Sequence, residues 1–392
     1  MKKNLSNLCL AGLIALAAVV ATGCGSDDAD FINNVPSTNL SEYVIIPNAG
    51  VAANVQGALV IKGVNTVDGT SSIVNNTFAS ANTANPVAVR SHPKINVFYA
   101  LNQGTGQLTS YSVGSNGAIA ELNSVACPVP AVAASNALVD SAYLIVHPAG
   151  GAVYAGIPGL LRQFNVASDG RLTASGFPDV NVGAGGWDGD FSHGGGQLHV
   201  PFGSAVRTYT VASTYQLTSP VDSALPAGSV VTDVDVRVGQ ASLFAAGAAN
   251  ADADGRIWSF SVADGVLSAA PTSVVSLTGS PLGTGDIHPN GQYYVGARNT
   301  NSVFAFTSDN ETGTLTGIGT SLITGANAIF TQVDPLAAFV VSTQGTGNNN
   351  IDARSLDQNG IITGSTSDNQ GLNVPKSFDF VQFINGGYVT RT

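Results

Sequence analysis

Apolar and polar residues alternate with a period of two along most of the chain, in short stretches separated by turn residues. Stretches such as QYYVGA, SVFAFT and GTLTGIG send successive side chains to opposite faces, which is typical of β-strands with one buried side. Gly, Pro, Asn and Asp gather between them, as in HPNG and SDNETG, and these residues favour tight turns. The pattern therefore predicts an all-β domain of short antiparallel strands, without helical periodicity outside the first 23 residues.

One strand-turn-strand unit recurs along the chain. A typical copy reads IHPNGQYYVGARNTNSVFAFTS, and a polar turn and a short further strand follow each copy. Successive copies lie 45 to 55 residues apart, and the position of His288 is filled in turn by His92, His147, Ser192, Arg237, His288, Asp334 and Phe383. Four antiparallel strands at this period are the signature of a β-propeller blade.

Strands from the two ends of the chain are expected to form one blade together. Six full units occupy about residues 86 to 370, and the C-terminal KSFDFVQFINGGYVTRT supplies only inner strands. The N-terminal SEYVIIPN, GALVIKGVN and SSIVNNTF supply the missing outer strands, which removes the open edges of a linear array. Both EYVIIP and GYVTRT fit the second strand of this composite blade. We therefore expect a seven-bladed β-propeller of four-stranded antiparallel blades over residues 43–392.

The repeated HPxG turn, the following aromatic strand and the tGxL turn of DNETGTLTGIG and ASDGRLTASG resemble the seven-bladed lactonase family. That family includes the 6-phosphogluconolactonases and the fungal muconate-lactonizing enzymes. The resemblance covers about residues 45–392 and implies a lactone hydrolase on a propeller fold. It also implies a histidine-rich HPH-like segment on an inner strand with an arginine and an acid nearby. The corresponding segments here read YLIVHPAG and GDFSHGGG.

The N-terminus has the features of an export signal. Two lysines precede an apolar run over residues 8–22 that is short for a membrane span, and ATGC ends at Cys24. A small residue and a glycine before a cysteine resemble the lipobox of bacterial lipoproteins, in which the cysteine is lipidated and becomes the first residue. The alternative is an ordinary signal cleaved near Ala21 or Gly23.

We therefore expect residues 1–23 to be a lipoprotein signal and residues 24–42 a polar tether from lipidated Cys24. Gly25 follows the cysteine, which by resemblance to lipoprotein sorting favours the outer membrane, on its periplasmic or surface side. The membrane is then one partner of the protein, reached through the N-terminal lipid. The other partner is an unidentified small molecule or protein, and we expect a monomer.

Composition excludes several classes of function. The chain has 25 acidic against 14 basic residues and a formal net charge of −11, so its surface repels nucleic acid and we expect no nucleic-acid partner. Cys9 lies in the signal and Cys24 in the lipobox, which leaves Cys127 as the single cysteine of the folded domain. A disulfide within the domain and a cysteine-based metal site are therefore excluded.

The repeat changes how the histidines are interpreted. His92, His147 and His288 stand before Pro at the start of a turn, and Asp334 fills the same place in the sixth unit. His and Asp are both suited to starting such a turn, so a structural role is favoured over catalysis. In the irregular third unit, His193 and His199 are six residues apart and could approach one another, but no third ligand is spaced to complete a metal site.

A polar column precedes these turns, on the strand expected to border the central channel. Two residues before the turn, the units carry Arg90, Ile145, Asp190, Asp235, Asp286, Gln332 and Val381. Four residues before it, on the same face, stand Asp188, Asp233 and Asp379. These carboxylates could accept N–H groups from the next blade, bind a ligand or a cation such as calcium, or include a general base of raised pKa.

The sequence thus predicts a lipid-anchored envelope propeller that binds a ligand or protein at a mouth of its channel. The alternative is a lactone hydrolase in which an inner-strand aspartate activates water and an arginine stabilises the oxyanion. The catalytic candidates are Asp286, Asp235, Asp190 and Arg90. The candidate ligand contacts are Asp188, Asp233, His193, Arg237 and Gln332. No protein metal site is assigned, and calcium is the one cofactor considered.

Overall fold

The computed structural model describes a set of segments that together cover most of the chain after residue 39. They are residues 40–48, 58–64, 71–78, 80–130, 142–183, 186–237, 242–249, 254–263, 266–277, 282–298, 302–309, 312–322, 326–335, 339–346, 351–357, 359–368, 377–384 and 387–389. Cys24, the expected signal and residues 24–39 of the expected tether lie outside these residues, whereas residues 40–42 form the start of the first strand. Within them, no helix is long and apolar enough to span a membrane.

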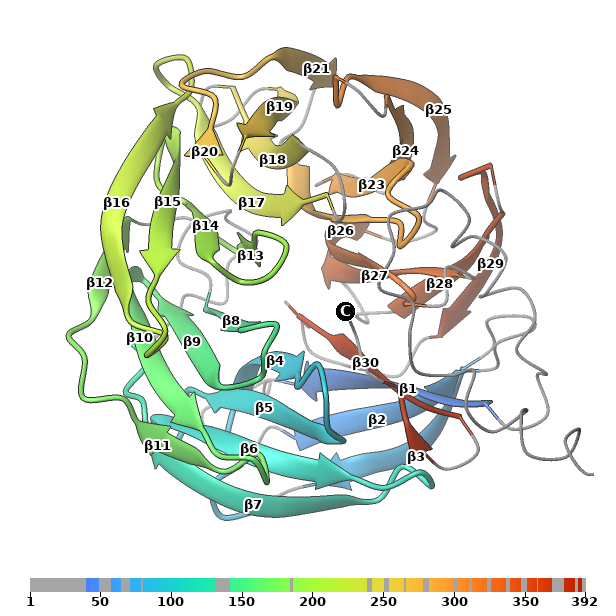
Figure 1. The fold of residues 1–392 in the computed structure, drawn as a ribbon. Helices are drawn as coiled ribbons and strands as arrows, with labels where there is room; N and C mark the ends of the chain where they lie inside the picture. Colours follow the sequence, from blue (N-terminus) through green and yellow to red (C-terminus); the bar gives the residue numbers. More distant parts are fainter. Residues whose placement is uncertain are drawn as a thin grey trace, which may run out of the picture. The chain divides into compact units, whose positions relative to one another are not determined.

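Six antiparallel sheets follow one another along the chain as blades 1 to 6 (Figure 1). Blade 1 contains β4 (Pro86–Ser91), β5 (Val97–Asn102), β6 (Gln107–Val113) and β7 (Ile119–Ala126). Blade 2 contains β8 (Tyr143–Val146), β9 (Ala152–Ile157), β10 (Gly159–Val166), β11 (Leu172–Ala174) and β12 (Val180–Gly183). Blade 3 contains β13 (Asp190–Phe191), β14 (Gln197–Pro201), β15 (Ala205–Val211) and β16 (Leu217–Ala224).

Blades 4 to 6 repeat the same order of strands. Blade 4 contains β17 (Val230–Val236), β18 (Ser242–Ala248), β19 (Gly255–Ala263), β20 (Val266–Leu267) and β21 (Ser273–Leu277). Blade 5 contains β22 (Leu282–Ile287), β23 (Tyr293–Arg298), β24 (Ser302–Ser308) and β25 (Leu315–Leu322), and blade 6 contains β26 (Ala326–Val333), β27 (Phe339–Thr346), β28 (Ile351–Leu356) and β29 (Ile362–Asp368). In blades 2 and 4 the outer strand is split, because β11 and β12 both pair with β10, and β20 and β21 both pair with β19.

Blade 7 joins the two ends of the chain in the order β3-β2-β1-β30-β31. It contains β1 (Leu40–Asn48), β2 (Ala58–Val64), β3 (Ser71–Phe78), β30 (Asp379–Ile384) and β31 (Gly387–Tyr388). The inner strand β30 pairs with β1, from Leu40 opposite Ile384 to Ile45 opposite Asp379. EYVIIP therefore provides the second strand, and the short β31 pairs with the other edge of β30. The predicted seven-bladed propeller with a composite closing blade is confirmed.

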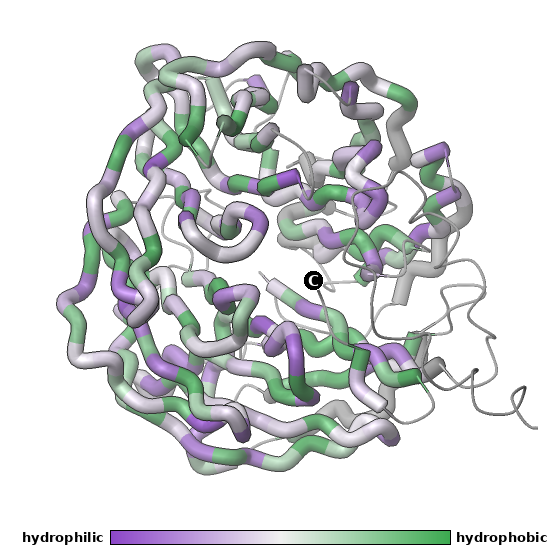
Figure 2. Tube along the Cα trace, in the orientation of Figure 1, coloured by the Kyte–Doolittle hydropathy of each residue, from purple (hydrophilic) through white to green (hydrophobic). Residues whose placement is uncertain are grey.

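The core is divided among the seams between blades. The described residues form seven apolar clusters, one for each pair of neighbouring blades around the ring. Strand β5 shows why, because it is buried on both faces: Phe98 belongs to the seam with blade 7, and Tyr99 belongs to the seam with blade 2. Apolar residues accordingly recur along the inner and middle strands in Figure 2. Each blade is thus held by both neighbours, and this fixes the geometry of the inner strands.

Candidate functional site at the inner strands

Two aspartates of the predicted polar column link neighbouring blades. Asp190 on β13 accepts hydrogen bonds from the backbone N–H of Phe191 (2.7 Å) and from that of Val236 in blade 4 (2.9 Å). Asp286 on β22 makes the same two bonds, both 2.8 Å long, with the next residue of its own strand and with Val333 of blade 6. These bonds offset the desolvation of the carboxylates and tie adjacent inner strands together.

Asp379 makes the same pair of bonds at the closing seam. Its Oδ2 accepts from the N–H of Ser91 in blade 1 (2.6 Å), and its Oδ1 accepts from Phe380 (2.8 Å). The alignment that placed Val381 in this column is therefore wrong by two residues. The reason is that the second strand of blade 7 comes from β1, so no HPxG turn marks the register of β30.

Asp235 is the exception among the aspartates of this column. By the repeat, its carboxylate should accept from Ile287 in blade 5, but that N–H bonds to Asp286 instead. Among the described residues, Asp235 Oδ2 is buried without a hydrogen-bond partner. Asp233, two residues earlier on β17, accepts from Gly285 N through Oδ2 (2.6 Å), whereas its Oδ1 is buried and also lacks a partner. These two carboxyl groups are thus incompletely satisfied.

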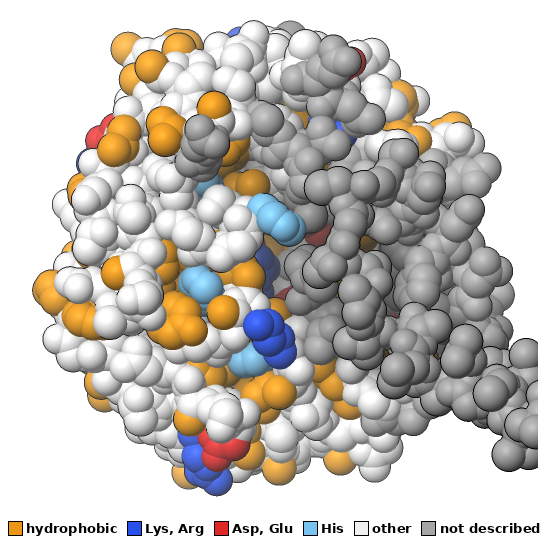
Figure 3. Space-filling model, in the orientation of Figure 1, with side chains coloured by type: hydrophobic (Ala, Val, Ile, Leu, Met, Phe, Trp, Pro, Cys, Tyr) orange, Lys and Arg blue, Asp and Glu red, His pale blue; other side chains and the backbone are white. Residues whose placement is uncertain are grey.

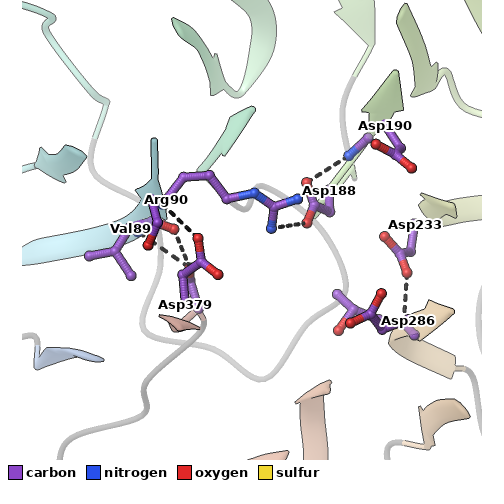
Figure 4. Close-up of polar contacts among 12 residues, drawn as sticks. Val89, Arg90, Asp188, Asp190, Asp233, Asp286 and Asp379 are labelled. Carbon is purple, nitrogen blue, oxygen red and sulfur yellow. Dashed lines mark hydrogen bonds and ion pairs between the residues drawn. The ribbon is translucent and has the colours of Figure 1, made fainter. Parts of the chain in front are cut away.

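Arg90 reaches from blade 1 across the centre toward blade 3 (Figure 4). Its Nη1 lies 3.1 Å from Asp188 Oδ2, and the two side chains are 23% and 14% exposed. The amide of Gln332 is satisfied at both ends when its nitrogen donates to the carbonyl of Phe378 and its oxygen accepts from Arg90 Nη1, each at 3.0 Å. The structure therefore brings together three predicted site residues, Arg90, Asp188 and Gln332, from three different blades.

The inner-strand carboxylates have raised pKa values. Burial is the largest cause in each case, and it raises the pKa of Asp188 to about 6 despite the opposing charge of Arg90. Burial raises the pKa of Asp286 to about 7 and that of Asp233 to about 8. For Asp235, burial and the neighbouring charges of Asp233 and Asp286 raise the pKa well above its ordinary value. Part of this group therefore holds protons near neutral pH.

The turn histidines connect blades rather than form a catalytic site. His92 Nδ1 accepts from the N–H of Lys94 (3.0 Å), and its Nε2 is 3.0 Å from the carbonyl of Gly150 in the next blade. His147 repeats this arrangement with the carbonyl of Gly195 at 3.1 Å. Burial lowers the pKa of both histidines, which favours the neutral ring with the proton on Nε2. The predicted structural role is confirmed, and Figure 3 shows histidine side chains as separate patches on the left part of the face.

This contact explains two of the glycines in the turns. Gly150 and Gly195 have φ values of +80° and +75°, which non-glycine residues rarely adopt. A Cβ at Gly150 would lie 2.4 Å from the ring of His92, and one at Gly195 would lie 2.5 Å from Nε2 of His147. The turn therefore requires glycine both for its backbone and for the close approach of the preceding blade.

Three further candidates lie outside the central group. His193 is exposed on a turn, whereas His199 is fully buried with Nδ1 2.8 Å from Thr208 Oγ1, and burial lowers its pKa to about 4. The two histidines thus differ in exposure, one at the surface and the other in the core. Arg237 is also buried, and it donates to the carbonyls of Gly291 and Asp309 of blade 5, so it supports the fold rather than an open ligand site. No three acidic, histidine or cysteine side chains of the described residues are arranged to hold a metal ion.

Tyr294 is a member of the central group that was not predicted. Its side chain is fully buried and its hydroxyl lies beside Asp235, with no hydrogen-bond partner of good geometry among the described residues. A signal was present in the repeat, because the other complete units place an apolar residue six positions after the turn residue. These residues are Phe98, Val153, Leu198, Leu243 and Val340. A single hydroxyl in an otherwise apolar column marks a polar environment on the facing strand.

Comparison with known proteins supports the fold. No family model and no curated protein matches the chain. Among solved structures, a candidate 6-phosphogluconolactonase from Bacteroides uniformis has a TM-score of 0.70 and 16% identity, over 88% of this chain and 100% of the other. The periplasmic gluconolactonase of Pseudomonas aeruginosa has a TM-score of 0.68 and 16% identity, over 87% and 99% of the two chains. The chain is thus a seven-bladed propeller similar to lactonase-family structures at distant identity.

Proposed function

We propose that this protein is a lipid-anchored envelope propeller that binds a ligand or a protein partner at a mouth of its channel. The observation that carries the proposal is the use of Asp190, Asp286 and Asp379 as links between blades. Each of these carboxylates has both oxygens engaged by backbone N–H groups, so neither oxygen is free to orient an attacking water. The inner strands then act as a rigid support, and the turns around them provide the variable surface for binding.

Lactone hydrolysis is the second candidate, and two side chains favour it. Asp235 has a buried carboxylate oxygen without a hydrogen-bond partner among the described residues, and the guanidinium of Arg90 pairs with Asp188 near the centre of the ring (Figure 4). A base beside a cation could activate water and stabilise an oxyanion. The similar Pseudomonas aeruginosa protein is named a periplasmic gluconolactonase, which is consistent with this chemistry outside the cytoplasm.

An assay of lactone turnover separates the two functions. The purified protein is mixed with gluconolactone, 6-phosphogluconolactone and simple aliphatic lactones, and acid release is followed against buffer alone. Under the binding proposal we expect no acceleration, because the inner-strand carboxylates are engaged or protonated near neutral pH. Turnover that is lost in Asp235→Asn and retained in the exposed control Asp169→Asn would establish the hydrolase instead.

Membrane anchoring is tested through Cys24. Cells that produce the wild-type chain are expected to incorporate labelled palmitate into the protein and to retain it in the detergent phase, because acyl chains on Cys24 partition into lipid. Cys24→Ser is expected to lose both properties and to yield a water-soluble propeller of unchanged melting temperature. Equal labelling of the wild type and the variant would contradict the anchor.

A further inference from the structure

Three buried oxygen atoms without hydrogen-bond partners among the described residues lie near one another in the seam between blades 4 and 5. They are Oδ1 of Asp233, Oδ2 of Asp235 and the hydroxyl oxygen of Tyr294. Asp233 is 1% exposed and Tyr294 is 0% exposed, so water from the bulk does not satisfy them. Asp233 and Asp235 are two residues apart on β17, where side chains point to the same face, and Asp235 lies within hydrogen-bonding reach of Asp233.

Two ionised carboxylates cannot satisfy one another, because neither carries a donor. Each unpartnered buried oxygen then costs its desolvation energy, and the two negative charges repel one another. One proton placed between the two groups removes both penalties, since it supplies a donor and cancels one charge. We propose that Asp233 and Asp235 share one proton at neutral pH, and that this acid–carboxylate pair makes the seam between blades 4 and 5 sensitive to pH.

The surroundings of the pair favour retention of the proton. Burial is the largest influence on both groups and raises the pKa of Asp233 to about 8, while that of Asp235 also rises well above its ordinary value. The ionisable side chains that act on the pair come from blades 3 and 5. They are Asp188 and Asp190 of blade 3 and Asp286 and Tyr294 of blade 5. The positive charge of Arg90 acts on three of these groups, Asp188, Asp190 and Asp286, and lowers their pKa values.

The direction of the pH dependence follows from proton binding in the two states. An unfolded aspartate loses its proton near pH 4, whereas the folded pair retains one up to about pH 8. Between these limits the folded state binds more protons than the unfolded state, so stability decreases as pH rises. Below about pH 4 both states are protonated and this contribution is fully present. Above the folded pKa the contribution is lost.

A melting experiment tests the proposal. The full protein is expected to melt about 3–6 °C higher at roughly pH 5.5 than at roughly pH 8.5. Asp235→Asn supplies a neutral donor to Asp233 at every pH, so it should at least halve this difference and melt above the wild type at the higher pH. Asp190→Asn is the matched control, because it makes the same chemical change at the same position of the neighbouring blade. It should lower the melting temperature at both pH values and keep most of the slope.

An infrared titration reads the proton directly and does not depend on whether a variant folds. Near neutral pH the wild type should show the C=O band of a protonated carboxylic acid, and the band should disappear above about pH 8. Asp235→Asn or Asp233→Asn should remove the contribution of the pair to the band, whereas the contribution of Asp286, whose pKa is about 7, should remain. The proposal is overturned if the wild type has no such band, or if Asp235→Asn keeps the wild-type slope and is destabilised equally at both pH values.

Discussion

Replacement of Asp379 with alanine is expected to reduce the free energy of unfolding by about 2–4 kcal/mol. The carboxylate is 1% exposed and joins the closing blade to blade 1 through Ser91 N at 2.6 Å. Its removal leaves two buried N–H groups, those of Ser91 and Phe380, without their acceptor, and each costs about 1–3 kcal/mol. Urea unfolding followed by the fluorescence of the buried Trp187 and Trp258 measures the change.

Asp169→Ala provides the control for this measurement. Asp169 pairs with Arg171, but their side chains are 59% and 52% exposed, so the change should stay within about 0.5 kcal/mol. Asp379→Asn should fall between the two variants, since an amide oxygen can replace one acceptor but not both. Equal unfolding midpoints for Asp379→Ala and Asp169→Ala would show that the bond between blades 7 and 1 contributes nothing measurable.

Replacement of Arg90 with methionine is expected to reduce the free energy of unfolding by about 3–5 kcal/mol near pH 8 and by less near pH 5.5. The substitution removes the guanidinium that pairs with Asp188 at 3.1 Å and lowers the pKa of three inner-strand aspartates. At high pH their charges remain buried without this cation. At low pH they protonate, because even with Arg90 present the pKa of Asp188 is about 6. Urea unfolding at the two pH values measures the difference.

The double variant Arg90→Met with Asp188→Asn tests the cause of this loss. Removal of the partner charge should restore part of the stability at about pH 8, since the buried carboxylate is no longer left without its cation. A side chain that acted only by filling space would give no such recovery. Losses that are equal at both pH values and additive in the double variant would contradict the electrostatic explanation.

The blade count and the composite closure could be predicted because alternation, turn residues and a constant period all describe the same unit. The column that contains Asp190 and Asp286 could be located for the same reason, since side chains on a strand repeat with a period of two. Asp379 was misplaced because β30 has no HPxG turn to mark its register. The repeat therefore does not predict the register of a strand whose partner comes from the other end of the sequence.

The partner of each carboxylate could not be predicted from the repeat. Asp190, Asp235 and Asp286 occupy one column, yet only the first and the last accept hydrogen bonds from the next blade. Asp235 differs because the N–H of Ile287 donates to Asp286 instead. Local backbone geometry, rather than residue type, determines which of the two carboxylates accepts this hydrogen bond. The reach of Arg90 to Asp188 likewise depends on the width of the ring, which the period of the sequence does not encode.

The pairing of β1 with β30 also bears on how the ring forms. The hydrogen bond between Glu42 and Gln382 spans 340 residues, so the closing blade depends on the longest loop in the fold. Contacts of such separation form slowly, and closure is expected to be the last and rate-limiting step of folding. Until then the edge of β1 that pairs with β30 remains open to other strands, and the apolar faces of blades 1 and 6 that pack against β30 remain uncovered. Because synthesis proceeds from the N-terminus, the chain is therefore most prone to aggregate just before β30 has been synthesised and can pair with β1.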